Sequence, residues 1–298
     1  KIILTFVAVF VFFISYLLLP TFYKYDDISK ELKNELLTKY ELDFTFTKNL
    51  KYNFFPRPHF IIKESSIIQD QKNISEIDTL KIFVSLNNLF SLKNINVNEV
   101  ILDNANFELE AKNSNFFFKL LNNNFLNTNL KIKDSNIFFR NSESEVLFIN
   151  KINSLKYYHD PKELKNILYS ENEIFNTPYS LEVIDNEDEK KIYTKLKLDI
   201  VKLQIENVFN YNEDIKLGFA SILFNNSKSL INYKTNKNFL EIEYYNELEK
   251  QKFLYNAKLN FKPFYSTFEG NADEINLSYL FGTNAIIAEL LKTKVFNN

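Results

Sequence analysis

Hydrophobic and polar positions follow three successive patterns along this chain, and each pattern predicts a different structure. Residues 2–19 form an apolar run that contains no charged side chain. A helix needs about 20 apolar residues to cross a hydrocarbon core of roughly 30 Å, so this run is just long enough to span a membrane. Pro20 follows it directly, and the rest of the chain is polar enough for water. We therefore expect one membrane anchor that carries a large water-exposed body.

The second pattern has a helical period. Apolar side chains recur at every fourth residue from Ile28 to Tyr40, which places them on one face of an α-helix. Asp26 or Asp27 can cap the start of this helix. Residues 21–41 are therefore predicted to form an amphipathic linker helix between the membrane and the body.

The third pattern is an alternation of apolar and polar residues that starts at Leu42 and is typical of strands with one buried face. A turn is expected at residues 55–58, because two prolines this close cannot lie in a central strand. A charged hairpin tip is expected at residues 186–191. The other predicted strands lie at residues 42–46, 50–54, 59–62, 80–86, 95–102, 107–109, 130–132, 137–139, 196–200, 215–219, 240–244 and 253–261.

Two segments of the body have helical rather than strand character. Residues 161–169 are predicted as a short helix with Asp160 as its cap and Pro161 at its first position, and residues 283–295 as a terminal helix. No alternation of strands and helices typical of a parallel sheet is found. The predicted fold is thus mostly β with terminal helices: one N-terminal transmembrane helix, then a long antiparallel β-meander curled into an open groove.

The domain boundaries follow from these patterns. Residues 1–20 are predicted as a transmembrane signal-anchor, residues 21–41 as the linker helix and residues 42–298 as a β-rich body, and a subdivision of the body is considered near residues 150–190. A cleaved signal peptide has an apolar core of about 7–15 residues and a small-residue cleavage site. The run here is longer and lacks such a site, so we favour an uncleaved anchor.

Composition limits the possible partners. The chain has 45% hydrophobic and 16% aromatic residues, which is ample for a folded core. Its 36 Lys and Arg balance 38 Asp and Glu, for a net charge of -2, so nothing indicates a nucleic-acid partner. Lys lies on both sides of the apolar run, and the positive-inside rule does not settle its orientation. A single N-terminal anchor before a large body places that body on the periplasmic side of a bacterial inner membrane.

Candidate catalytic chemistry is scarce. The chain has no Cys, which excludes thiol chemistry and cysteine ligands for a metal. Its two histidines are His59 and His159, and neither has a second ligand at metal-binding spacing; His59, beside Pro58, is interpreted as a strand-edge residue. Only three glycines occur, too few and too scattered for a phosphate-binding loop. We expect no enzyme activity, no metal and no cofactor.

The large apolar side chains on one face of the strands allow two interpretations. They can form an ordinary closed core or pack on the terminal helix, or part of the face can line an open groove that shelters lipid acyl chains, where each methylene contributes about 0.8 kcal/mol. Periodicity does not separate the two. For the groove, the predicted lining residues are Phe44, Phe46, Leu50, Tyr52, Phe54, Ile82, Val84 and Leu86.

Several segments near the N-terminus resemble, in order and spacing, the N-terminal region of the AsmA-like family. They are the anchor that ends at Pro20, the amphipathic helix, the strand and turn LKYNFFPRP at residues 50–58, which is similar to an FPxP turn, and the strands at residues 59–67, 80–95 and 97–107. The chain departs from the family pattern where Tyr40-Glu41 stands in place of a glycine. The resemblance covers about the first hundred residues.

The resemblance implies an inner-membrane-anchored periplasmic protein of bacteria, related to bridge-like lipid transfer proteins. Such a protein would shelter or transfer phospholipid in a hydrophobic β-groove, support outer-membrane lipid homeostasis or assembly, and meet envelope protein partners. The alternative function is a non-catalytic envelope scaffold or interaction module with a closed β core. An envelope hydrolase ranks below both, because the sequence offers no pair of nucleophile and base.

Overall fold

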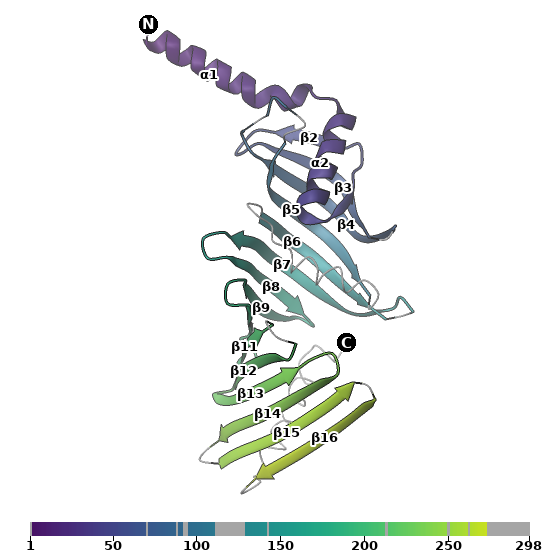
Figure 1. Ribbon diagram of the computed structural model, residues 1–298. Coiled ribbons are helices and arrows are strands. Elements are labelled where there is room, and N and C mark those ends of the chain that lie inside the picture. The colour runs from purple at the N-terminus through teal and green to yellow at the C-terminus, as the bar shows by residue number, and fades with distance from the viewer. Residues whose placement is uncertain are drawn as a thin grey trace. The chain divides into compact units, whose positions relative to one another are not determined.

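The computed structural model describes residues 2–69, 71–87, 89–91, 95–110, 129–141, 143–211, 214–248, 251–261 and 263–272. The chain divides into two compact units, unit 1 from Lys1 to Lys162 and unit 2 from Glu163 to Asn298. Among the described residues, helices occur only in unit 1, whereas both units are rich in strands (Figure 1). The predicted mostly β fold behind an apolar N-terminal helix is confirmed.

The chain begins with the apolar helix. Helix α1 comprises Ile2–Leu18, and the 3₁₀ turn η1 continues it as Leu19–Phe22. Together these 21 residues are long and apolar enough to cross a membrane. Most of the side chains of α1 are exposed, and Leu17 near its end is buried. Such a helix fits a lipid environment better than a protein core.

Helix α2, Tyr25–Tyr40, forms where the helical period predicted it. It ends at Glu41, whose left-handed backbone (φ 54°) is the usual way to terminate a helix. The predicted apolar stripe is buried from Ile28 to Tyr40, whereas the next residue outside the stripe, Leu37, is exposed. The tyrosine hydroxyl at the helix end donates a hydrogen bond to the carbonyl of Asn129 (3.2 Å), so α2 packs against the strands of unit 1 (Figure 1).

Unit 1 contains one sheet in the order β1-β3-β4-β5-β6-β7, with β2 also paired to β3. Its strands are β1 (Asp43–Thr45), β2 (Leu50–Asn53), β3 (His59–Gln69), β4 (Lys72–Val84), β5 (Val97–Leu109), β6 (Asn129–Arg140) and β7 (Val146–Asp160).

One strand pair differs from the predicted antiparallel meander. β5 and β6 are parallel, with Val100 opposite Leu130. A parallel neighbour requires a long connection, and residues 110–128 separate these two strands in the sequence. Short alternating stretches gave no indication of this, because alternation is the same in both pairings.

The core of unit 1 lies between α2 and one face of this sheet. Cross-strand partners share a face, and the row Leu50, Ile62, Leu80 and Leu102 runs across β2 to β5 in register. The last three of these side chains are buried, as is the stripe of α2. Burial of aliphatic side chains at about 25 cal/mol per Å² therefore ties the helix to the sheet.

A row of backbone irregularities crosses the same sheet. Glu64, Asn104 and Asp134 lie at one level of β3, β5 and β6, and all three have positive φ (56°, 55° and 46°). On either side of this row the buried positions are three residues apart rather than two, as from Ile62 to Ser65. A left-handed residue re-aims the side chains that follow it. In each of these strands, two consecutive polar residues interrupt the alternation. The left-handed residue turns the side chains that follow back toward the core.

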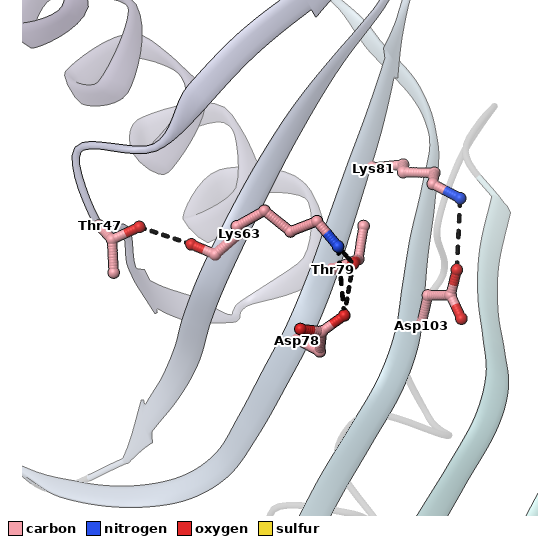
Figure 2. Close-up of polar contacts among 6 residues, drawn as sticks. All are labelled: Thr47, Lys63, Asp78, Thr79, Lys81 and Asp103. Carbon is pink, nitrogen blue, oxygen red and sulfur yellow. Dashed lines mark hydrogen bonds and ion pairs between the residues drawn. The ribbon is translucent and has the colours of Figure 1, made fainter.

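Polar side chains pair next to this row. Figure 2 shows the ammonium of Lys63 bound to the carboxylate of Asp78 (3.3 Å) and to the hydroxyl of Thr79 (2.5 Å). On neighbouring strands, Lys81 pairs with Asp103 (3.3 Å). The hydrogen bond from Thr79, followed by that from Lys63, holds the pKa of Asp78 below its usual value. Ion pairs in place of apolar groups mark this part of the sheet as water-facing.

Unit 2 contains a simple antiparallel meander in which each strand pairs with the next. Its strands are β8 (Lys165–Ile174), β9 (Thr177–Asn186), β10 (Lys191–Leu198), β11 (Leu203–Asn210), β12 (Lys216–Phe224), β13 (Ser227–Thr235), β14 (Phe239–Leu248), β15 (Gln251–Phe261) and β16 (Phe264–Ala272). The charged tip predicted at residues 186–191 is confirmed as the turn between β9 and β10. Among the described strands of unit 2, no further pair closes the sheet into a barrel.

The predicted helix at residues 161–169 is wrong. β7 ends at Asp160, residues 161–164 form a turn, and β8 starts at Lys165. The Asp160 carboxylate does accept a hydrogen bond from the backbone N–H of Lys162 (2.9 Å), but this bond closes a turn. Alternating burial in β8 indicates that strand pairing outweighed the local helix signal. The terminal helix predicted at residues 283–295 lies outside the described residues.

Truncation of the α2 stripe should destabilise unit 1. Leu36 is fully buried and its neighbour Leu37 is 51% exposed. We expect Leu36→Ala to lower the free energy of unfolding by about 2–5 kcal/mol, and Leu37→Ala to change it by less than about 0.5 kcal/mol. Urea unfolding of the full chain in detergent, followed by circular dichroism, measures both. Equal effects of the two changes would contradict this packing of α2.

Candidate functional site

The candidate site is the apolar face of the unit 2 sheet. Because cross-strand partners share a face, the register assembles rows of apolar side chains across consecutive strands. One row joins Phe209, Gly218, Tyr233, Ile242, Ala257 and Phe268 from β11 to β16. A second row joins Ala220, Ile231, Tyr244, Tyr255 and Gly270 from β12 to β16, and a third joins Leu181, Leu196, Ile205 and Ile222 from β9 to β12.

This face differs from the core of unit 1 in that the described residues cover little of it. In the described part of unit 2, Leu168 is the only large apolar side chain that is buried. The members of the three rows are half-buried, except for Phe268 and Gly270 on β16, which are exposed. No helix among the described residues of unit 2 packs on the sheet. Contiguous apolar surface of this extent marks an interaction site or a ligand groove.

The last three strands form a hollow on this face. Its volume is about 260 Å³, and its lining consists of Ile242, Tyr244, Tyr255, Ala257 and Phe268. The ring of Tyr255 lies 5.3 Å from that of Tyr244 on one side and 5.3 Å from that of Phe268 on the other. Three aromatic side chains together with Ile242 and Ala257 thus surround an apolar recess suited to a hydrocarbon chain.

Two glycines, which have no side chain, leave room on this face for tyrosine rings from the neighbouring strands. The ring of Tyr233 lies over Gly218, so that a Cβ there would be only 1.9 Å from the ring carbon Cζ. The hydroxyl of Tyr233 donates a hydrogen bond to Oδ1 of Asn207 (2.9 Å). The polar end of this tyrosine therefore has a partner within the apolar face. Gly270 has the same relation to Tyr255, at a wider 3.2 Å.

Tyr233 and Tyr255 on this face stay uncharged at neutral pH. Burial raises the pKa of Tyr233, and burial together with the neighbouring Tyr244 raises the pKa of Tyr255. An acid whose pKa is raised stays protonated to higher pH. These two side chains therefore offer hydroxyl groups and aromatic rings without negative charge.

The opposite face of unit 2 carries ladders of ion pairs. Glu241 on β14 binds Lys234 on β13 (2.5 Å) and Lys258 on β15 (2.6 Å), and Lys195 binds Glu206 (2.7 Å). The hydrogen bond from Lys234, followed by that from Lys258, lowers the pKa of Glu241. These charges are exposed or partly exposed to solvent and contribute little stability individually. Their role here is to show which face of the sheet meets water.

The eight residues predicted to line a groove all lie in unit 1 and do not share one environment. Phe44, Ile82 and Val84 are buried; Phe46, Leu50 and Tyr52 are half-buried; Phe54 and Leu86 are exposed. Five of them belong to strands β1, β2 and β4. Their role in lipid binding stays a prediction.

Tyr52 is the one predicted lining residue with a titratable side chain. Its hydroxyl donates a hydrogen bond to the carbonyl of Leu17 at the end of α1 (2.8 Å), and its ring packs on Phe60 (5.1 Å). Burial and the nearby Tyr16 raise its pKa to about 12. The side chain thus connects the sheet to the apolar helix.

The two histidines are both buried in unit 1. His59 is the first residue of β3, paired with Asn53 on one side and Phe83 on the other, so its interpretation as a strand-edge residue is wrong. Its ring stacks on Phe83 (4.8 Å), and its Nδ1 lies 2.7 Å from the carbonyl oxygen of Arg57. Within the described residues, no group of three or more His, Asp or Glu side chains could hold a metal ion.

Sequence reasoning missed unit 2 as the place of the uncovered face, although its alternation was recognised. The available signal was whether an amphipathic helix accompanies the strands. The stripe of α2 provides a cover for the N-terminal strands, whereas residues 170–282 show no comparable helical period. Strands without a cover are the ones to expect at a ligand site.

Comparison with known protein families gives a match to the AsmA family. The sequence pattern of the AsmA family matches residues 1–283, which is nearly the whole chain and includes all described strands of both units. A search of curated proteins finds no match.

The close approach of Gly218 and Tyr233 provides a test of the face. We expect Gly218→Ala to displace the tyrosine ring and to lower the free energy of unfolding by about 1–3 kcal/mol, as overpacking does. Gly270→Ala should cost less, because its Cβ would meet Tyr255 at 3.2 Å rather than 1.9 Å. Chemical denaturation of both variants measures the difference. If Gly218→Ala is the milder change, the ring does not lie over Gly218.

Proposed function

The chain belongs to the AsmA family, and on this premise we propose that it shelters phospholipid acyl chains along the apolar face of unit 2. The protein would be held in the bacterial inner membrane by α1, with its body in the periplasm, and would support outer-membrane lipid homeostasis or assembly. The observation that carries this proposal is the apolar face of unit 2, which the described residues leave largely uncovered: most of its large side chains are half-buried, Leu168 is buried, and Phe261, Phe264 and Phe268 are exposed.

The dimensions of the face suit an acyl chain. Nine strands at about 4.8 Å spacing extend about 38 Å across the sheet, whereas one leaflet of hydrocarbon is about 15 Å thick. Each methylene moved from water onto such a surface gains about 0.8 kcal/mol. A face of this width can therefore hold the tails of a phospholipid and leave its headgroup in water.

The residues on this face favour a passive role. Two of its titratable groups, Tyr233 and Tyr255, have pKa values above the usual range. The two histidines are buried in the other unit, and the chain has no Cys. Binding without catalysis is the function that these side chains can perform.

The runner-up function is an envelope scaffold or interaction module with a closed core. It predicts that a protein, rather than lipid, covers the apolar face. The absence of barrel closure among the described strands favours the lipid proposal, because an open sheet leaves the face accessible. Covalent capture of the occupant distinguishes the two.

Adjacent residues on β14 offer a matched pair for this capture. Tyr244 lies on the apolar face, and Glu243 lies on the charged face and is exposed. A photoreactive phenylalanine analogue is placed at either position of the full chain in cells labelled with radioactive phosphate. We expect labelled phospholipid to be crosslinked at Tyr244 and not at Glu243. A protein adduct at Tyr244 without lipid would favour the scaffold.

The same analogue at Phe46 and Leu50 tests the lining first predicted in unit 1, since both side chains are half-buried. Lipid at these positions as well as at Tyr244 would extend the groove into unit 1. Lipid at Tyr244 alone would confine it to unit 2.

A charge on the apolar face should expel the lipid. Ala257 lines the hollow, and its neighbour Asn256 is exposed on the charged face. We expect Ala257→Asp to reduce crosslinking from Tyr244 more than about tenfold, because desolvation of a carboxylate costs well over 1.4 kcal/mol. Asn256→Asp should leave crosslinking unchanged. Circular dichroism confirms that both variants fold, and undiminished lipid in a folded Ala257→Asp variant would contradict the proposed lining.

A further inference from the structure

Three segments that are distant in sequence meet at the end of α1. Residues 16–24 end the apolar helix, residues 52–58 contain the proline turn before β3, and residues 85–91 follow β4. Figure 1 shows α1 leaving unit 1 at the end where β2 lies. We call these three segments the base of unit 1.

Hydrogen bonds from three tyrosines hold the base together. Tyr16 donates to the carbonyl of Leu86 (2.7 Å) and accepts from the backbone N–H of Leu89 (3.1 Å). Tyr23 donates to the carbonyl of Leu89 (2.6 Å), and the bond from Tyr52 to Leu17 joins β2 to the helix. The position of α1 in a membrane therefore determines how deep the base lies.

The length of the apolar helix then places the base at the level of the lipid headgroups and upper acyl chains. Residues 2–22 extend about 31 Å as a helix, which matches a hydrocarbon core of about 30 Å. Tyr16 precedes Phe22 by six residues, or about 9 Å along the helix axis. A helix that crosses the membrane with this apolar length carries Tyr16 below the lipid headgroups, and the backbone of Leu86 and Leu89 is bound to it.

The base presents the side chains that such a position requires. Phe22, Phe55 and Phe90 are 81%, 79% and 65% exposed, and each comes from a different segment. Phe54 and Leu86 beside them are also exposed. Aromatic side chains concentrate at the membrane–water interface, where their apolar bodies leave water.

The charges of the base agree with this location. Its three segments contain no Asp or Glu, and their only charged residues are Lys24 and Arg57. The Arg57 side chain is 58% exposed; it lies 3.2 Å from Glu99 and over the ring of Phe83. Cations at the headgroup level are attracted to lipid phosphates. A surface rich in Asp and Glu would instead be repelled by these phosphates.

We propose that the base of unit 1 is inserted into the interfacial layer of the membrane that α1 enters, with Phe22, Phe54, Phe55, Leu86 and Phe90 among the lipid headgroups and upper acyl chains. The occupant of this surface is the bilayer itself. Unit 1 is then held against the membrane at three segments rather than suspended from one helix. This inference does not depend on lipid binding by unit 2.

Single tryptophans test the proposal, since the chain contains no Trp. The full-length variants Phe55→Trp and Phe90→Trp are reconstituted into phosphatidylethanolamine–phosphatidylglycerol vesicles, with or without lipid brominated near the top of the acyl chain. The matched control is Leu147→Trp, because Leu147 is 62% exposed at the opposite end of the strands of unit 1. An apolar side chain in the interface lies about 5–10 Å into the headgroup boundary, so we expect at least about twofold quenching for the two base variants.

Each outcome is decisive. Quenching of Phe55→Trp and Phe90→Trp with little quenching of Leu147→Trp supports insertion of the base. If all three are equally insensitive to brominated lipid while the protein floats with the vesicles, the base lies in water and the proposal is overturned. It is also overturned if the protein does not float with the vesicles. Loss of lipid crosslinking at Tyr244 with normal quenching here would contradict only the function proposed for unit 2.

Discussion

A sheet with one apolar face is stable in water only when something covers that face, and the two units of this chain differ in what does so. In unit 1 the buried stripe of α2 faces buried rows such as Ile62 and Leu80, and the result is a conventional core. In unit 2 the described residues provide strands and turns but no helix. The large side chains on its apolar face stay half-exposed, and a ligand or partner is the natural means of covering them. The proposed function follows from this difference in cover.

The parts of the fold that depend on local periodicity could be predicted from the sequence. The apolar run, the stripe from Ile28 to Tyr40 and the alternation of the meander all correspond to observed elements. Features that depend on pairing partners could not, since alternation is the same in parallel and antiparallel strands. The parallel pair of β5 and β6 is one case. The turn at Asp160–Pro161 is another, because a cap signal and a tight turn use the same two residue types.

The candidate site was missed for a related reason. Alternation identifies an apolar face but does not report whether that face is covered. Phe44 and Ile82 have the same pattern as Ile242 and Tyr244, yet the first pair is buried and the second pair lines a hollow. Their difference arises from α2, which packs on the strands of unit 1, whereas the described residues of unit 2 contain no helix. Tertiary packing, rather than the strand sequences themselves, distinguishes core from candidate lining.

The row of left-handed residues in unit 1 has a consequence for how this sequence can change. Glu64, Asn104 and Asp134 each re-aim one strand at the same level of the sheet. A deletion of one residue on either side of the row in a single strand would turn every later side chain of that strand to the wrong face, while its neighbours kept theirs. Viable changes in length are therefore confined to the turns, or must occur at the row in several strands together. The sheet consequently tolerates substitutions far better than insertions. The strand lengths on each side of the row are therefore expected to change together or not at all.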